Sequence, residues 1–239
     1  MASATHSEHA LDAGAGQRSL GILGGTFNPP HLGHLALARH ALSELRLERV
    51  LLIPAHTPPH KPAGEGEGDP GPEQRLRMCR LLLAGEQRLS ACALEVERGG
   101  PSYTVDTLSA IHAENPDVAL TFIVGADTAS TLGTWREPVR VLELADLAVA
   151  TRAGSVGRER VLDTVAGLLA DRRDGGVPRV RFLAMPEIDI SSSQVRRLAA
   201  AGEPIEGLVG PNLAAYIAER RLYRAPVPAV SAQGETGRR

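Results

Sequence analysis

The sequence predicts a doubly wound α/β fold, in which helices cover both faces of a parallel sheet. Short apolar runs of strand length, rich in Val, Ile and Leu, alternate along the chain with longer segments of helical periodicity. The runs are apolar at almost every position, which is typical of strands that are buried on both faces. Ligands of such sheets bind beyond the carboxyl ends of the strands, so the residues after each run are the first candidates for function.

Six apolar runs are predicted as strands, because each has strand length and is followed by a turn-forming or charged residue. They cover residues 19–23, 50–53, 89–96, 119–124, 147–150 and 180–183. Between them, apolar residues recur at helical spacing and predict four amphipathic helices. The four stripes are Leu32, Leu35, Ala38, Leu42 and Leu45; Leu76, Cys79 and Leu83; Val105, Leu108 and Ile111; and Val161, Val165 and Leu168.

We expect one domain over residues 18–224. Residues 1–17 and 225–239 are small, polar or rich in Pro and Gly, so both are predicted to be disordered tails. The segment 63–72 (AGEGEGDPGP) is predicted to be an exposed loop. The first 17 residues carry acids and have no apolar core, which argues against a secretory signal.

The composition excludes several classes of protein. Lys and Arg number 26 against 28 Asp and Glu, a net charge of −2, so no overall field favours nucleic acid. No apolar run approaches the roughly 20 residues that span a bilayer. Two cysteines, Cys79 and Cys92, are too few for a disulfide framework and are predicted to be core residues. We therefore expect a cytoplasmic protein without nucleic-acid or membrane partners, and the oligomeric state, a homo-oligomer included, stays open.

The first predicted strand is followed by GGTFNPPHLGH, which leads directly into a predicted helix. Gly24 and Gly25 allow the backbone to approach a ligand, and the helix start offers free N–H groups with a partial positive charge. His31 and His34, three residues apart, face one region and can donate hydrogen bonds to phosphate oxygens. The segment therefore indicates a phosphate site.

Two other interpretations of these histidines stay open. The junction could be an ordinary strand–turn–helix connection with incidental histidines. Alternatively, a zinc site could use His31, His34, His56 and His60, although no cysteine or carboxylate completes a set with zinc-ligand spacing. The segment is neither a GxxxxGK[ST] phosphate loop nor a GxGxxG dinucleotide fingerprint.

A second candidate anion site lies at residues 190–197 (ISSSQVRR). Ser191 and Gln194 fit the S-x-x-Q capping box that fixes a helix start, and such a start attracts anions. Arg196, one turn into the helix, can place two N–H groups on phosphate oxygens. The alternative is a capped surface helix with solvated arginines.

Together the two segments resemble the HxGH and ISSxxxR signatures of the nucleotidyltransferase α/β-phosphodiesterase superfamily. Four more segments resemble those of bacterial nicotinate-nucleotide adenylyltransferases: 53–61 (IPAHTPPHK), 98–108 (RGGPSYTVDTL), 122–135 (FIVGADTASTLGTW) and 208–223 (LVGPNLAAYIAERRLY). The resemblance spans residues 19–223 in consistent order. It implies a Rossmann-like nucleotidyltransferase fold with a C-terminal helical segment. Three positions depart from the family pattern: Asn28 replaces Asp, Gly210 replaces the first Pro, and Arg221 replaces a common Gly.

The resemblance also implies a role for each matching residue, with ATP, its bound Mg²⁺ and nicotinate mononucleotide as ligands and no metal ligand from the chain. The catalytic residues would be His31, His34 and Arg196. The ATP site would comprise Gly25, Thr26, Phe27, Gly125, Asp127, Ser191 and Ser192. The mononucleotide site would comprise His60, Lys61, the backbone amides of Tyr103 and Thr104, and the ring of Trp135.

Four of these residues also have a purely structural interpretation. Trp135 could be core, Lys61 a solvated charge, Tyr103 a packing residue and Asp127 a helix cap. The expected function is adenylyl transfer from ATP to nicotinate mononucleotide, giving deamido-NAD and pyrophosphate by direct in-line attack. The alternatives are an adenylyltransferase for nicotinamide mononucleotide or phosphopantetheine, and a non-catalytic nucleotide sensor.

Overall fold

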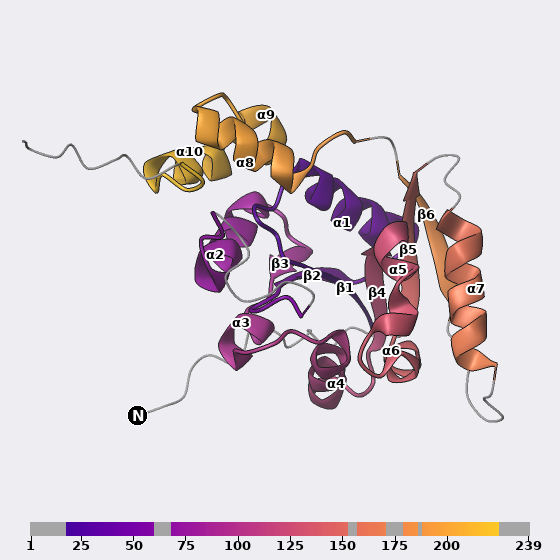
Figure 1. Cartoon of the computed structure of the whole chain (residues 1–239). Helices are drawn as coiled ribbons and strands as arrows, with labels where there is room; N and C mark the ends of the chain where they lie inside the picture. The colour runs from indigo at the N-terminus through magenta and orange to yellow at the C-terminus, as the bar shows by residue number, and fades with distance from the viewer. Residues whose placement is uncertain (1–17, 60–67, 153–156, 171–178, 186–187, 225–239) are drawn as a thin grey trace, which may run out of the picture.

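Six parallel strands form one sheet in the order β3-β2-β1-β4-β5-β6, which confirms the predicted doubly wound fold (Figure 1). The computed structural model describes residues 18–59, 68–152, 157–170, 179–185 and 188–224. The strands are β1 (Ser19–Gly25), β2 (Arg49–Pro54), β3 (Leu89–Ala91), β4 (Ala119–Gly125), β5 (Asp146–Arg152) and β6 (Val180–Met185).

Helices connect the strands and complete the C-terminal end. They are α1 (Leu32–Glu44), α2 (Pro72–Leu82), α3 (Leu94–Arg98), α4 (Thr104–Glu114), α5 (Ala126–Ala129), the 3-10 turn η1 (Leu132–Thr134), α6 (Pro138–Leu144), α7 (Gly157–Leu169), α8 (Ser192–Ala201), α9 (Glu206–Val209) and α10 (Pro211–Glu219). The four predicted helical stripes lie in α1, α2, α4 and α7. None of the described helices is long and apolar enough to cross a bilayer.

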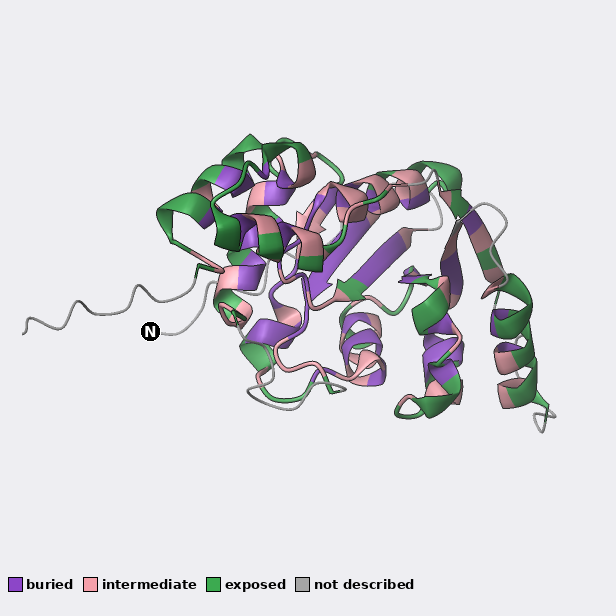
Figure 2. Ribbon diagram, turned by 45° about the horizontal axis from the view of Figure 1, so that its top comes forward, coloured by how far each residue is buried: buried purple, intermediate pink, exposed green. Residues whose placement is uncertain are grey.

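The sheet separates two hydrophobic cores, because successive strand residues point to opposite faces. In β2, Leu51 and Ile53 enter one core, whereas Val50 and Leu52 enter the other. Helices α4, α6 and α7 complete the first core, and α1, α2 and the C-terminal helices complete the second (Figures 1 and 2). Burial on both faces explains the continuous apolar runs in the sequence.

Both cysteines are buried, as predicted, and burial raises the pKa of each thiol, that of Cys92 to about 12. Neither is therefore poised as a nucleophile.

The predicted strand over residues 89–96 is wrong beyond Ala91, because the chain enters helix α3 at Leu94. The buried Glu95 carboxylate accepts a hydrogen bond from Thr107 Oγ1 at 2.6 Å, and Arg98 Nη2 donates to Thr107 Oγ1 at 3.1 Å. These contacts with α4 join residues far apart in sequence, so the local apolar pattern could not reveal them. The predicted tails and residues 63–67 of the predicted loop lie outside the described residues, and Pro72, the last residue of that loop, already belongs to α2. The domain boundaries stay a prediction.

Helix α10 ends in a Schellman turn, which explains one departure from the family pattern. Leu222 N–H donates to Ile217 O at 3.0 Å, and Arg221 N–H donates to Ala218 O at 3.2 Å. The turn places Arg221 in the left-handed region, at φ 51°. Glycine is the usual residue at this position because it has no Cβ to clash there. Gly210, just before α10, has φ 82°, a conformation that proline cannot adopt.

We expect Arg221→Gly to raise the free energy of unfolding by up to about 1 kcal/mol, because it relieves left-handed strain of roughly that size. Ala218→Gly, an exposed position inside α10, is the matched control and should lower it by about 1 kcal/mol. Urea unfolding of the three proteins measures both changes. A loss of stability in Arg221→Gly would contradict the strain at this turn.

Candidate active site

The candidate site lies at the carboxyl edge of the sheet, between neighbouring strands β1 and β4. The helix after β1 packs in one core, whereas the segment after β4 packs in the other. The two connections therefore diverge here, which makes this edge the topological switch point where doubly wound sheets bind ligands. His31 is the N-cap of α1, and Gly25 and Gly125 are the last residues of the two strands.

The two histidines stack at the start of α1. Their ring centroids are 3.8 Å apart, and His31 N–H donates to His34 Nδ1 at 3.2 Å. Phe27, in the left-handed region at φ 52°, packs its ring edgewise on His34 at 5.0 Å. A Cβ on Gly33 would lie 3.0 Å from the His31 ring, so glycine between the histidines allows this close approach.

Both histidines are uncharged at neutral pH. Burial lowers the pKa of His31 to about 4, and burial together with the neighbouring His31 lowers that of His34 to about 3. Because His34 Nδ1 accepts the hydrogen bond from His31, the ring proton of the neutral form lies on Nε2. His34 therefore presents an N–H donor, while His31 Nδ1 is buried without a partner among the described residues.

Helix α8 lies against the segment that precedes α1, which we call the 26–30 loop. Ser191 caps α8 by accepting from Gln194 N–H at 3.1 Å, and Gln194 Oε1 accepts from Ser191 N–H at 3.4 Å, so the predicted capping box forms. Arg196 Nη1 donates to Asn28 O at 2.7 Å, and its Nη2 donates to Ser193 Oγ at 3.1 Å. The two segments that the sequence singled out are thus in direct contact.

Two more side chains hold the 26–30 loop from the C-terminal region. Ser192 Oγ donates to Pro29 O at 2.8 Å, and Tyr223 Oη donates to Asn28 Oδ1 at 2.8 Å. Burial, the largest cause, raises the pKa of the Tyr223 phenol, which therefore stays a donor. Asn28 still provides the acceptor oxygen that the usual Asp would supply.

Arg75 is a residue that the sequence analysis missed. It is fully buried in α2 and donates to Thr26 O at 2.8 Å, Ala55 O at 2.5 Å and His56 O at 2.9 Å. Its Nε donates to Asp69 Oδ1 at 3.1 Å. One signal could have revealed it: Arg75 occupies the same helical face as the buried residues Met78, Cys79 and Leu82.

The segment after β2 meets the start of α4. His56 N–H donates to Ser102 Oγ at 2.8 Å, and Ser102 N–H donates to Thr57 O at 2.9 Å. Tyr103 is the N-cap of α4, so the helix begins at Thr104. No hydrogen bond from the Tyr103 or Thr104 amide to another described residue is present, which leaves both donors available.

Trp135 and Arg136 lie in the segment after β4, and Arg136 approaches the same helix start. The Trp135 ring is half-buried, packs edgewise on Phe122 at 5.8 Å, and donates Nε1–H to Thr131 Oγ1 at 3.2 Å. The Arg136 guanidinium lies 4.9 Å from the centre of the Tyr103 ring. Trp135 is thus partly core, as one alternative held, yet retains exposed ring surface.

The remaining candidate residues are less constrained. Gly125 is the N-cap of α5, so Asp127, exposed in the first turn, is not the cap. His60 and Lys61 lie outside the described residues. In the described part of the chain, no group of three or more His, Cys, Asp or Glu side chains could hold a metal ion. The zinc alternative also included His60, so it stays untested.

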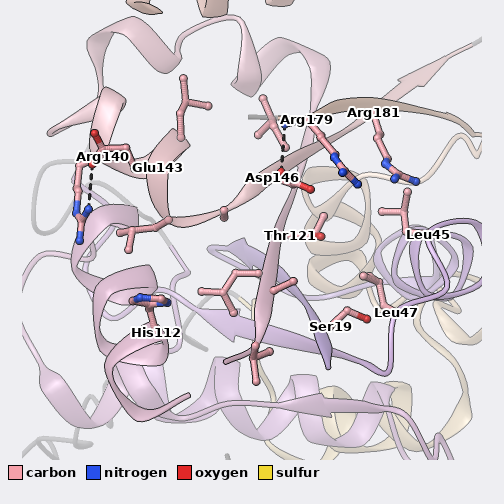
Figure 3. Close-up of a pocket in the computed structure, with 17 residues that line it drawn as sticks. Ser19, Leu45, Leu47, His112, Thr121, Arg140, Glu143, Asp146, Arg179 and Arg181 are labelled. Atoms are coloured by element: carbon pink, nitrogen blue, oxygen red, sulfur yellow. Dashed lines mark hydrogen bonds and ion pairs between the residues drawn. The ribbon is translucent and has the colours of Figure 1, made fainter. Parts of the chain in front are cut away.

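A cavity of about 740 Å³ lies at the opposite, amino edge of the sheet, near the first residues of β1, β4, β5 and β6. Figure 3 shows His112 and Arg140 on one side of it and Arg179 and Arg181 on the other. Arg140 pairs with Glu143 at 2.9 Å, so part of this charge is already compensated. Because the polar groups that line this cavity do not converge, we place the candidate active site at the carboxyl edge of the sheet instead.

Comparisons with known proteins show which family the chain belongs to. The cytidylyltransferase-like family model matches residues 22–198. A probable nicotinate-nucleotide adenylyltransferase of Symbiobacterium thermophilum is 41% identical over 202 residues, covering 84% of this chain and 93% of that protein. A probable nicotinate-nucleotide adenylyltransferase of Pelobacter propionicus is 39% identical over 217 residues, covering 85% of this chain and 97% of that protein.

Solved structures share the fold at lower identity. The nicotinic acid mononucleotide adenylyltransferase of Plasmodium falciparum, complexed with APC, superposes with a TM-score of 0.66 at 17% identity, covering 86% of this chain and 97% of that one. A structure from Vibrio parahaemolyticus, described as that of a putative nicotinate-nucleotide adenylyltransferase, superposes with a TM-score of 0.57 at 17% identity, covering 87% of this chain and 97% of that one. The chain therefore belongs to the cytidylyltransferase-like family and, within it, to the nicotinate-nucleotide adenylyltransferases.

Proposed function

We propose that a phosphate oxygen of nicotinate mononucleotide attacks the α-phosphorus of ATP directly. The new P–O bond forms deamido-NAD, the bond to the β-phosphate oxygen breaks, and pyrophosphate leaves. The chain is a nucleotidyltransferase of NAD biosynthesis, as its family membership establishes. The observation that carries the proposed mechanism is the neutral histidine pair at the N-terminus of α1, beside the N-terminus of α8.

This chemistry needs no protein nucleophile. The phosphate monoester of the mononucleotide is largely dianionic at pH 7, since its second pKa is about 6. The protein must therefore bring two anions together and stabilise the charge that develops on the α-phosphate and the leaving pyrophosphate. Two neutral N–H donors, two helix N-termini and one arginine suit that task.

We assign His34 Nε2–H and His31 to the ATP phosphates near the reacting phosphorus. A neutral donor gains strength as negative charge builds on the oxygen it contacts, and it needs no proton transfer to do so. Gly25, Thr26 and Phe27 would line the adjoining phosphates, and Gly125 with Asp127 would contact the adenosine. The left-handed Phe27 turns the backbone at this point.

Ser191, Ser192 and Arg196 would hold the β- and γ-phosphates at the N-terminus of α8. The guanidinium of Arg196 has five N–H groups, and two of them donate to Asn28 O and Ser193 Oγ. The remaining N–H groups and the charge stay available to a phosphate.

Mg²⁺ would arrive with ATP and neutralise part of the phosphate charge when bound. The donor set near the histidines fits an ion held mainly by phosphates and water, because Asn28 supplies no carboxylate and its Oδ1 already accepts from Tyr223. The chain's own residues then position the phosphates.

The mononucleotide would bind between the start of α4 and Trp135. The free amides of Tyr103 and Thr104 suit the nicotinate carboxylate, and the exposed ring surface of Trp135 suits the pyridine. His60 and Lys61 remain proposed contacts to its phosphate. We expect the enzyme to act in the cytoplasm.

Pyrophosphate release tests the proposal against its rivals. ATP, Mg²⁺ and nicotinate mononucleotide should together release pyrophosphate, whereas a nucleotide sensor would release none. Faster release with nicotinamide mononucleotide or phosphopantetheine would favour the related adenylyltransferases. Adenylylated protein isolated after incubation with ATP alone would contradict direct transfer.

We expect His34→Ala to lower kcat by about 10²–10³-fold, because one transition-state donor is lost. His34→Asn should lower it similarly, since Asn can accept from His31 N–H yet has no donor at the Nε2 position. Steady-state kinetics on variants with a wild-type circular dichroism spectrum measure the effect. If His34→Ala kept more than about a third of kcat, the assigned role would be wrong.

The histidine pair also makes stability depend on pH. Below the unfolded-state pKa of about 6.5, the unfolded chain binds protons that the buried rings bind only near pH 4 and 3. The stability from the neutral rings is therefore fully present above pH 6.5 and is lost as the pH falls toward 4 for His31 and toward 3 for His34. Each ring contributes a slope approaching about 1.4 kcal/mol per pH unit. Urea unfolding from pH 7 to 4.5 should show a shallower slope in His34→Asn, and an unchanged slope would contradict the burial of a neutral ring.

Specificity should come from the carboxylate, because nicotinate and nicotinamide rings stack almost equally well. A carboxamide would leave a backbone N–H unpaired at about 1–3 kcal/mol and lose a helix-terminus term of about 0.3–1 kcal/mol. We therefore expect a preference for nicotinate mononucleotide of at least about tenfold in kcat/KM. Trp135→Ala should lower kcat/KM for both mononucleotides and leave the ratio of the two values largely unchanged. If the wild-type kcat/KM values for the two mononucleotides lay within about threefold of each other, the proposed carboxylate site would be wrong and dual specificity would be favoured.

A further inference from the structure

Arg75 has no role in the proposed site, yet its side chain reaches both segments that would bind the substrates. Only 1% of the side chain is exposed. Nη1 donates to Thr26 O at 2.8 Å and to Ala55 O at 2.5 Å, and Nη2 donates to His56 O at 2.9 Å. One planar guanidinium thus bonds three backbone carbonyls beyond the ends of β1 and β2.

Asp69 compensates the buried charge. Its Oδ1 accepts from Arg75 Nε at 3.1 Å and from Gly71 N–H at 2.9 Å, just before α2 begins. A buried cation is tolerated when it is paired and its N–H groups are bonded, and both conditions are met here. The geometry is specific, since the four acceptors come from three separate parts of the chain.

The three carbonyls belong to two binding segments. Thr26 begins the 26–30 loop assigned to ATP. Ala55 and His56 begin the segment that leads toward the proposed phosphate contacts of the mononucleotide. The same His56 donates its N–H to Ser102 Oγ, directly before the start of α4 where the nicotinate carboxylate would bind. Arg75 therefore links the backbone of the two substrate sites.

We infer that Arg75 is a positioning residue, which sets the distance between the ATP segment and the mononucleotide segment. The inference rests on the proposed function. Direct transfer requires the attacking oxygen and the α-phosphorus in line at close approach, and a misplacement of about 1 Å can cost about 100-fold in rate. Each substrate keeps its own contacts when the two segments shift apart. The rate of the transfer step therefore falls, whereas the affinity for each substrate alone does not change.

Replacing Arg75 with lysine tests this geometry, because lysine retains the positive charge and lacks the planar guanidinium with its several N–H donors. An ammonium group places its donors on one nitrogen and cannot bond Thr26 O and His56 O from opposite corners of a planar group. We expect Arg75→Lys to lower kcat by at least about tenfold, while the Kd of ATP and that of nicotinate mononucleotide, each measured alone by calorimetry, change by less than about threefold. Arg39→Lys, an exposed arginine of α1 paired with Glu86, is the matched control and should retain wild-type kcat.

Asp69→Asn provides a second variant if Arg75→Lys fails to fold. It retains an acceptor oxygen for Gly71 N–H and removes the charge beside Arg75 Nε, so kcat should fall by about threefold or more with both Kd values unchanged. The inference is overturned if the folded variants keep kcat within about twofold, or if the loss falls on either Kd instead. A wild-type protein that releases no pyrophosphate would overturn the proposed function, which separates the two failures.

Discussion

The 26–30 loop has three backbone carbonyls that bond side chains from distant parts of the chain, and the geometry of the site depends on those bonds. Thr26 O, Asn28 O and Pro29 O accept from Arg75, Arg196 and Ser192, which lie 49, 168 and 163 residues away in sequence. A carbonyl left unbonded in a partly buried turn costs about 1–3 kcal/mol. Satisfying all three from α2 and α8 therefore fixes the loop in one conformation before any ligand binds.

A fixed loop determines what the following helix start can do. With the loop held, His31 caps α1, Gly33 lets the rings stack, and His34 keeps its proton on Nε2. Burial keeps both rings neutral at physiological pH. Neutral donors in a fixed position stabilise developing charge without reorganisation, which is the largest contribution available to a reaction that needs no nucleophile from the protein. The same constraint explains why the site requires the C-terminal helices as well as the sheet.

The sequence predicted the features that depend on local pattern. The continuous apolar runs reflect two buried faces, Ser191 and Gln194 form the expected cap, and the two histidines stack at the expected helix start. The runs could not show that the chain turns into α3, because the contacts of Glu95 reach across to α4. The roles assigned to the site residues rest on resemblance and stay predictions.

Arg75 shows why the rest of the site was not predictable. Three of its four partners are backbone carbonyls, which carry no mark in the sequence, and they lie 19, 20 and 49 residues away from it. Only its position on the buried face of α2 set it apart from a surface arginine. Arg221 is the converse case, since the family pattern has glycine there and the left-handed turn at φ 51° supplies the physical reason.

The most direct test of a pre-formed site is a pair of crystal structures, of the free protein and of its complex with a non-hydrolysable ATP analogue and nicotinate mononucleotide. We expect the backbone of residues 26–30 to superpose within about 1 Å, as is usual for pre-organised sites. The bonds from Arg75, Arg196 and Ser192 should be present in both structures. A loop that moves by more than about 2 Å, or that makes these bonds only in the complex, would contradict the account.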